Sequence, residues 1–224
     1  MMRKLFICLA NSKKYNQRCI AGVEVYLGKN QKFHVVLQGE RPVWIRPVTK
    51  EGRGEVPTSL VEKMKLLDVY EVNVIRPNPK GHQTENVLFD KYSLKKVKTL
   101  ENVTAEKMNW LLVKEQKCIF YGQHKTIPKD SIHSVNHSLC IVRAENVRFY
   151  NKKYREWEVE LRLRVQFTYL DAQYDMPVTD VDFLANYQQH PIEEVTDKTI
   201  FLTISISNEF EGLFYKLAAG VIII

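Results

Sequence analysis

Length, composition and charge limit the classes of protein to which this chain can belong. Its 224 residues suit one large domain or two small ones, and 45% hydrophobic with 26% charged residues argues against disorder. No apolar run approaches membrane-spanning length, so we expect no membrane association. The apolar N-terminus is interrupted by polar residues at 11–14, too soon for a secretory signal, and we expect a cytoplasmic protein.

The net charge of +7 is unevenly distributed along the chain. Residues 1–125 hold 23 Lys and Arg against 12 Asp and Glu, a net charge of +11, whereas residues 126–224 hold 10 against 14, a net charge of −4. This asymmetry favours a polyanion as the partner of the first half. The alternative is a lysine-rich surface that only keeps the protein in solution.

The four cysteines, Cys8, Cys19, Cys118 and Cys140, lie far apart in apolar stretches. Zinc sites usually have paired ligands at short spacing, and this sequence contains no C-x-x-C pair. We therefore expect buried free thiols in a reducing compartment, no metal and no other cofactor.

In the first half, continuous or alternating apolar residues predict strands at 3–10, 18–27, 33–37, 41–48, 69–75 and 87–89. Gly22 falls inside the second of these strands and predicts a bulge or bend there. Ser59 and Glu62 fit the capping box of a helix of about two turns. A second helix is predicted at 104–113, with Thr104 as its N-cap.

The second half repeats this order of elements. Strands are predicted at 139–142, 157–167, 201–207 and 214–223, with a polar turn at 151–154 and an extended segment at 169–174. Thr179 is the expected cap of a short helix at 181–189.

When the segments 33–37 and 41–48 are counted as one strand, each half has three strands, a short helix and two strands, which is the order of the OB-fold. We predict a mainly β protein with short helices, made of two tandem OB-like five-stranded Greek-key barrels. The junction is expected in the polar stretch 121–137, so residues 1–120 form a basic barrel and 121–224 a mildly acidic one.

Several short motifs carry a family resemblance that runs in order through essentially the whole chain. They are FICLANSKK at 6–14, RCIAG at 18–22, WIRPV at 44–48, LDV at 67–69, HQTENV at 82–87, VTD at 178–180 and YKLAAG at 215–220. Together they resemble the dual OB-containing domain family. The resemblance implies a bacterial or archaeal nucleic-acid-binding module of the kind discussed with anti-phage conflict systems, and it implies no mechanism.

The segment at 41–48 is the first candidate binding surface. With period two, Val43 and Ile45 point to a buried face, while Trp44 and Arg46 point to an open face suited to stacking and phosphate contact. The flanking prolines place this strand near a sheet edge. The structural alternative is a Trp44 that covers the rim of the core beside a solvated Arg46. The candidate nucleic-acid-binding residues are Lys13, Lys14, Arg18, Arg41, Trp44, Arg46 and Arg53, with Tyr15 as a second stacking platform.

A second candidate is a polar loop that suggests a pocket for a base edge, a metal or an acid–base pair. Its residues are Arg76, His82, Gln83, Glu85 and Asn86. The alternative is a loop whose amides satisfy backbone groups at a barrel mouth.

A third cluster, Asp175, Thr179, Asp180 and Asp182, could hold Mg²⁺, but helix capping explains Thr179 and Asp180 better. No phosphate-binding loop, nucleophile elbow, zincin or dinucleotide motif is present, so no catalytic residue is assigned.

Three functions stay open at this point. The first is a non-enzymatic module that binds nucleic acid, single-stranded by preference, through the basic barrel, while the second barrel engages a protein partner. The second is a sensor or enzyme for a nucleotide-like small molecule that uses the loop at 82–86. The third is a scaffold that assembles through the strand at 157–167.

Overall fold

The computed structural model describes residues 1–50, 54–112, 117–153, 161–192, 195 and 197–224. It divides into two compact units, Met1–Val103 and Thr104–Ile224. The predicted boundary at 120/121 lies later in the chain, and Ile119 packs in the core of the second unit. The first unit holds 19 Lys and Arg against 10 Asp and Glu, a net charge of +9, and the second holds 14 against 16, a net charge of −2.

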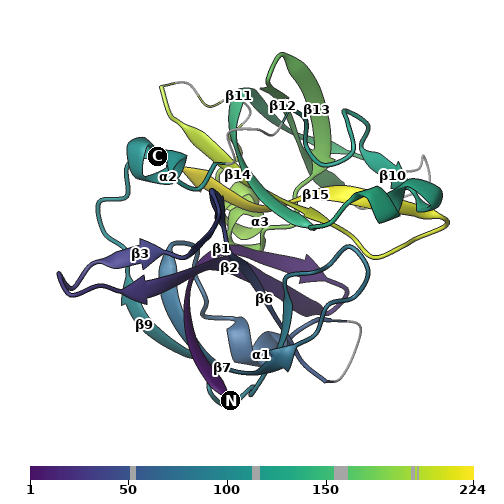
Figure 1. Ribbon diagram of the computed structural model, residues 1–224. Coiled ribbons are helices and arrows are strands. Elements are labelled where there is room, and N and C mark those ends of the chain that lie inside the picture. Colours follow the sequence, from purple (N-terminus) through teal and green to yellow (C-terminus); the bar gives the residue numbers. More distant parts are fainter. Residues whose placement is uncertain (51–53, 113–116, 154–160, 193–194, 196) are drawn as a thin grey trace. The chain divides into compact units, whose positions relative to one another are not determined.

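The first unit is a closed barrel (Figure 1). Its ring runs through β1 (Met2–Lys14), β2 (Gln17–Leu27), β6 (Trp44–Val48), β8 (Asn86–Phe89) and β7 (Asp68–Pro77), and β7 pairs back onto β1. The pair β6–β8 is parallel, whereas the other pairs of the ring are antiparallel. This is the strand order of an OB-fold, as predicted.

Short elements surround this ring. They are β3 (Phe33–Val35), β4 (Leu37–Gln38), β5 (Arg41–Pro42), β9 (Lys95–Thr99) and the helix α1 (Thr58–Val61). Val61 and Met64 are buried in the core of the barrel, and the Asn11 side-chain amide donates to the Met64 carbonyl at 3.0 Å. These contacts hold α1 against the barrel.

The predicted capping box of α1 is wrong. The helix begins at Thr58, with Pro57 as N-cap and no side-chain cap. The Thr58 N–H instead donates to Gln17 Oε1 at 3.0 Å, so a side chain from β2 satisfies the helix start.

The strand β6 is not at a sheet edge, which its prolines would suggest, because it lies between β2 and β8. Trp44 and Ile45 pair with β2, whereas Arg46, Pro47 and Val48 pair with β8. Since the strand changes partner before Pro47, its missing N–H interrupts no bond to β2. Residues 45–48 are all buried, so the predicted alternation of a buried and an open face is also wrong.

The second unit is a curled six-stranded sheet (Figure 1). Its strands, in spatial order, are β10 (Thr126–Pro128), β15 (Leu213–Ile223), β14 (Ile200–Ile206), β11 (Leu139–Lys152), β12 (Arg162–Tyr169) and β13 (Ala172–Pro177). A parallel bridge between Val178 and Ala218 links the end of β13 to β15. The connectivity is again OB-like, and the prediction of two OB-like domains is confirmed.

Three helical elements belong to this unit: α2 (Ala105–Asn109), the 3₁₀ helix η1 (Lys129–Ser134) and α3 (Val181–Gln189). Phe183 and Tyr187 of α3 pack on Phe149, with ring centroids 4.6 and 6.4 Å apart. The predicted α3 is correct in its bounds, but its N-cap is Asp180, one residue after Thr179.

Two predictions in this unit need correction. The strand expected at 157–167 begins at Arg162 among the described residues, and residues 154–160 lie outside them. The segment at 169–174 is not continuously extended, because Leu170 and Asp171 have positive φ angles of 47° and 61° and form the turn between β12 and β13.

Candidate nucleic-acid interface

The turn between β1 and β2 presents several of the predicted binding residues. Lys13 pairs with Arg18 and Lys14 with Gln17 in the register of this hairpin. Lys13 is exposed, and Lys14 Nζ lies 3.6 Å from Glu55 Oε2. Tyr15 sits at the turn with a φ of +53°, and its side chain is 67% exposed. The hairpin tip therefore offers a cation beside an open aromatic ring.

The residues that follow β6 are hydrogen-bonded to the β1–β2 hairpin and so hold it near the end of β6. Arg18 and Val56 exchange two backbone hydrogen bonds, at 3.0 and 2.8 Å. The Thr49 hydroxyl donates to the Glu55 carbonyl at 2.9 Å. The hairpin tip and the residues just after β6 are thus neighbours on one side of the first barrel.

A pocket of about 180 Å³ opens at this end of β6. Its lining comes from three segments: the end of β6 and the chain after it (Val48, Thr49, Lys50 and Gly54), the end of β7 and the loop after it (Arg76, Asn78 and Lys80), and β8 (Asn86 and Leu88). None of these described lining residues is acidic. Lys50, Arg76 and Lys80 are exposed, and none of the three forms an ion pair with another described residue. Among the described residues, the positive charge of this lining therefore has no acidic partner.

Asn86 forms the buried wall of this pocket. The residue is 3% exposed, and its side-chain Nδ2 donates to Gln83 Oε1 at 3.4 Å. Its Oδ1 is buried and has no hydrogen-bond partner in the described part of the chain. The residue is also fixed through its backbone, because its carbonyl accepts from the Asn78 N–H at 2.8 Å. Among the described residues, this buried oxygen thus has no donor, and Asn86 lines the same pocket as the three cations.

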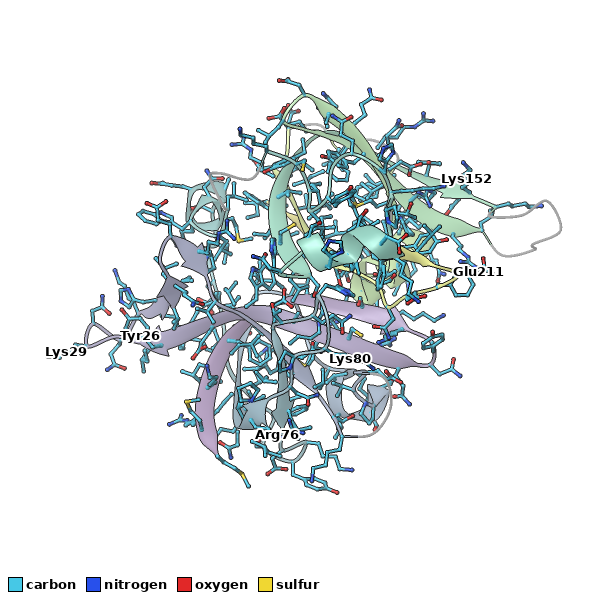
Figure 2. All side chains as sticks on the ribbon, turned by 45° about the vertical axis from the view of Figure 1, so that its right-hand side comes forward. Tyr26, Lys29, Arg76, Lys80, Lys152 and Glu211 are labelled. Carbon is cyan, nitrogen blue, oxygen red and sulfur yellow. The ribbon has the colours of Figure 1, made fainter. Side chains whose placement is uncertain are left out.

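The loop predicted to form a pocket is divided by the structure. Arg76 and Asn86 line the pocket together, whereas His82, Gln83 and Glu85 are not among its lining residues. His82 and Gln83 are buried, and Lys80 and Gln83 exchange backbone bonds of 3.2 and 3.0 Å around the turn. Lys50 and Lys80 were not predicted from the sequence. The only feature that could have indicated them is their position, since Lys50 follows β6 and Lys80 lies in the loop before β8. Arg76 and Lys80 are labelled in Figure 2.

The other residues predicted to bind nucleic acid differ in how exposed they are. Arg46 is only 4% exposed, so it does not lie on an open face. Burial raises the pKa of the Cys19 thiol, and the nearby charges of Lys14 and Arg46 oppose that shift. Arg41 is exposed and Trp44 is half-buried, whereas Arg53 lies outside the described residues.

Two of the three carboxylates in the cluster suggested for Mg²⁺, those of Asp175 and Asp180, have other partners. Asp175 accepts from Arg164 Nε and from the Tyr150 hydroxyl, both at 2.8 Å. Asp180 accepts from the backbone N–H groups of Asp182 and Phe183, which is the capping role expected of it. The described residues contain no group of three His, Cys, Asp or Glu side chains arranged for a metal.

The cysteines are free thiols, as expected, and Cys8 and Cys140 are buried while Cys19 and Cys118 are half-buried. Among the described helices, none combines the length and apolar character that crossing a bilayer requires.

The fold and this surface define a tandem OB-type protein with a cationic first barrel. The family model for the dual OB-containing domain matches residues 4–221, and the chain belongs to this family. No curated protein matches it.

Solved structures give two distant likenesses. One is a murine DNA-binding protein bound to double-stranded DNA, with 9% identity, a TM-score of 0.36, and coverage of 100% of this chain and 98% of that chain. The other is the tetrameric p202 HIN2, with 9% identity, a TM-score of 0.30, and coverage of 100% and 92%. At these TM-scores neither likeness bears on function.

Proposed function

We propose that this protein binds nucleic acid, single-stranded by preference, through its first barrel. OB barrels bind strands across their second and third strands and the adjoining loops. Here these parts are β2, β6, the β1–β2 turn and the β7–β8 loop.

The exposed cations around these elements carry the proposal. Among the described residues, none of the five forms an ion pair: Lys13, Arg41, Lys50, Arg76 and Lys80. In contrast, Lys95 and Lys96 of β9 lie 3.0 Å from Glu71 and 2.7 Å from Asp68, so much of the charge on β9 is compensated within the protein. Unpaired cations near the expected binding face suit phosphates, which give affinity without sequence preference.

The single-strand preference is supported by the aromatic residues beside these cations. Tyr15 is exposed at the hairpin tip and Trp44 is half-buried at the start of β6, and bases of a single strand are free to stack on such rings. Because Arg46 is buried, the proposal does not depend on its contacting the ligand.

Several finer expectations rest on the family resemblance or on charge alone. These are a prokaryotic and cytoplasmic setting, a role in anti-phage defence, and a protein partner for the mildly acidic second unit. They stay predictions.

Binding of the double variant Lys13→Gln/Arg41→Gln to a labelled single-stranded oligonucleotide tests the proposal. We expect weaker binding and a salt slope smaller by about 0.7 for each phosphate that the variant no longer neutralises. Lys98→Gln is the matched control, since Lys98 is exposed on β9, which pairs with the first part of β7, away from Arg76. Equal affinity of the double variant and the wild type would refute the proposed surface.

A further inference from the structure

The pocket at the end of β6 combines two requirements that one ligand has to meet. Lys50, Arg76 and Lys80 bring three positive charges to its lining, and no described lining residue offers a negative charge. Asn86 Oδ1, buried in the same lining, needs a hydrogen-bond donor. The matching ligand is an anion that carries a hydroxyl or amino group close to its charge.

Water alone does not explain this arrangement. A water molecule donating to Asn86 Oδ1 would satisfy the amide but would add no negative charge to a described lining that holds three cations and no acidic residue. A simple anion would compensate the charge but would give Asn86 Oδ1 no donor. Both requirements are met when phosphate and donor belong to one molecule.

The volume restricts the ligand further. A pocket of about 180 Å³ is smaller than the 300 Å³ or so at which sites for whole small-molecule ligands begin. It has room for a phosphate and part of a sugar, with the base outside. This size suits one unit of a longer strand better than an enclosed free nucleotide.

We propose that this pocket binds one ribose–phosphate unit of an RNA strand. The phosphate lies among Lys50, Arg76 and Lys80, and the ribose 2′-hydroxyl donates to Asn86 Oδ1. The 2′-hydroxyl is the donor near the phosphate that DNA lacks, so the pocket gives the protein a preference for RNA over DNA. This inference rests on the proposed function and adds the kind of nucleic acid to it.

The position of Asn86 makes such discrimination effective. Its amide donates to Gln83 Oε1 at 3.4 Å and its backbone carbonyl accepts from the Asn78 N–H at 2.8 Å, and both contacts favour the orientation in which Oδ1 is buried. A DNA strand would leave this buried acceptor without a partner, and an unpaired buried polar group lowers affinity.

Three single-stranded oligonucleotides of one sequence test the inference by fluorescence anisotropy: RNA, DNA and 2′-O-methyl RNA. We expect RNA to bind about two- to tenfold more tightly than either of the others, the effect of one hydrogen bond. The 2′-O-methyl strand matters because it keeps the ribose and its 2′ oxygen, while a methyl group replaces the hydrogen that would be donated. This comparison needs no change to the protein.

Variants then assign the effect to the pocket. Arg76→Gln/Lys80→Gln should weaken binding of all three strands, whereas the control Lys29→Gln changes an exposed lysine at the tip of the β2–β3 hairpin, apart from Arg76 and Lys80 (Figure 2). Asn86→Ala should bind RNA and DNA equally. Its thermal unfolding is measured alongside, because Asn86 is buried.

The outcomes separate this inference from the proposed function. Binding of all strands with equal affinity would overturn the RNA preference and leave the proposed function standing. No binding of any strand at low salt would overturn both. Adenosine 5′-monophosphate that competes as strongly as the whole RNA strand would show that the ligand is a free nucleotide, and would overturn the assignment to a strand.

Discussion

Gly22 is the residue at which the first barrel leaves no space for a side chain. A Cβ at this position would lie 1.8 Å from the Ile7 carbonyl oxygen and 2.8 Å from Cδ2 of Phe6. The neighbouring strand β1 has its register irregularity between Cys8 and Ala10, opposite this residue. The bulge predicted from Gly22 thus lies on the partner strand, which approaches the glycine closely.

Replacing Gly22 with alanine should therefore destabilise the protein by about 3 kcal/mol, because the backbone of β1 at Ile7 would have to shift to make room for the methyl group. Urea denaturation measures the change. Gly39→Ala is the matched control: its Cβ meets nothing within 4 Å, but its φ of +63° costs an alanine about 1 kcal/mol. A loss for Gly22→Ala no larger than for Gly39→Ala would contradict the close approach.

Lys216 is a fully buried lysine in the second unit. Its ammonium donates to the Gly122 carbonyl at 2.5 Å and lies 5.8 Å from the centroid of the Tyr174 ring. Burial lowers its pKa to about 8, against 10.5 for an unperturbed lysine.

This shift sets a pH dependence of stability. Between about pH 8 and pH 10.5 the unfolded chain keeps the proton that the folded protein has lost, so the free energy of unfolding should rise with pH by an amount on the order of 3 kcal/mol. Lys216→Met should remove this rise. Urea denaturation across that pH range measures both proteins, and parallel pH profiles would show that Lys216 keeps an ordinary pKa.

At the scale of elements, α3 depends on one carboxylate. Asp180 Oδ1 accepts from two N–H groups at the start of the helix, and Oδ2 accepts from the Val221 N–H at 2.8 Å. Burial nevertheless raises the pKa of Asp180 to about 6, from an ordinary 3.8, because it outweighs the effect of these donors. The carboxylate thus joins the helix start to β15.

Asp180→Asn should destabilise the protein at pH 7 by about 2 kcal/mol. The amide keeps one acceptor oxygen for the helix start, but its NH₂ group would face the Val221 N–H, so two donors would meet where a hydrogen bond was formed. A native pKa above the unfolded value means that the wild type loses stability as pH rises from about 4 to 6, by an amount on the order of 3 kcal/mol. The stability of the wild type relative to the variant should therefore fall over this range. Thermal melts at each pH test it, and a constant difference would contradict the raised pKa.

Some strands and helices could be predicted from apolar periodicity, and others could not. The bounds of α3, β14 and β15 follow from apolar periodicity and agree with the structure. Periodicity failed at β6, because a strand between two neighbours in a small barrel is covered on both faces and its arginine is buried as well. It also missed β9, whose lysines are typical of an exposed edge strand and hide any alternation.

At the scale of the whole molecule, the repeated element order was enough to predict two OB-like units, because each strand, helix and turn leaves a local signal. The candidate site leaves a weaker signal in the sequence. Lys50, Arg76 and Lys80 are separated in the chain, and only the parallel pairing of β6 with β8 and the antiparallel pairing of β7 with β8 bring them to one pocket. No local pattern encodes that convergence. Asn86 was identified from its polar loop, but its unpartnered oxygen required the structure.

The net charge of +9 on the first unit underlies the central claim, that this unit tracks phosphates. The most direct test is the affinity of the wild-type protein for single- and double-stranded oligonucleotides across a salt series. We predict a linear fall of log affinity with log salt concentration and tighter binding of single strands throughout. Affinity that does not change with salt, or no binding at low salt, would contradict it.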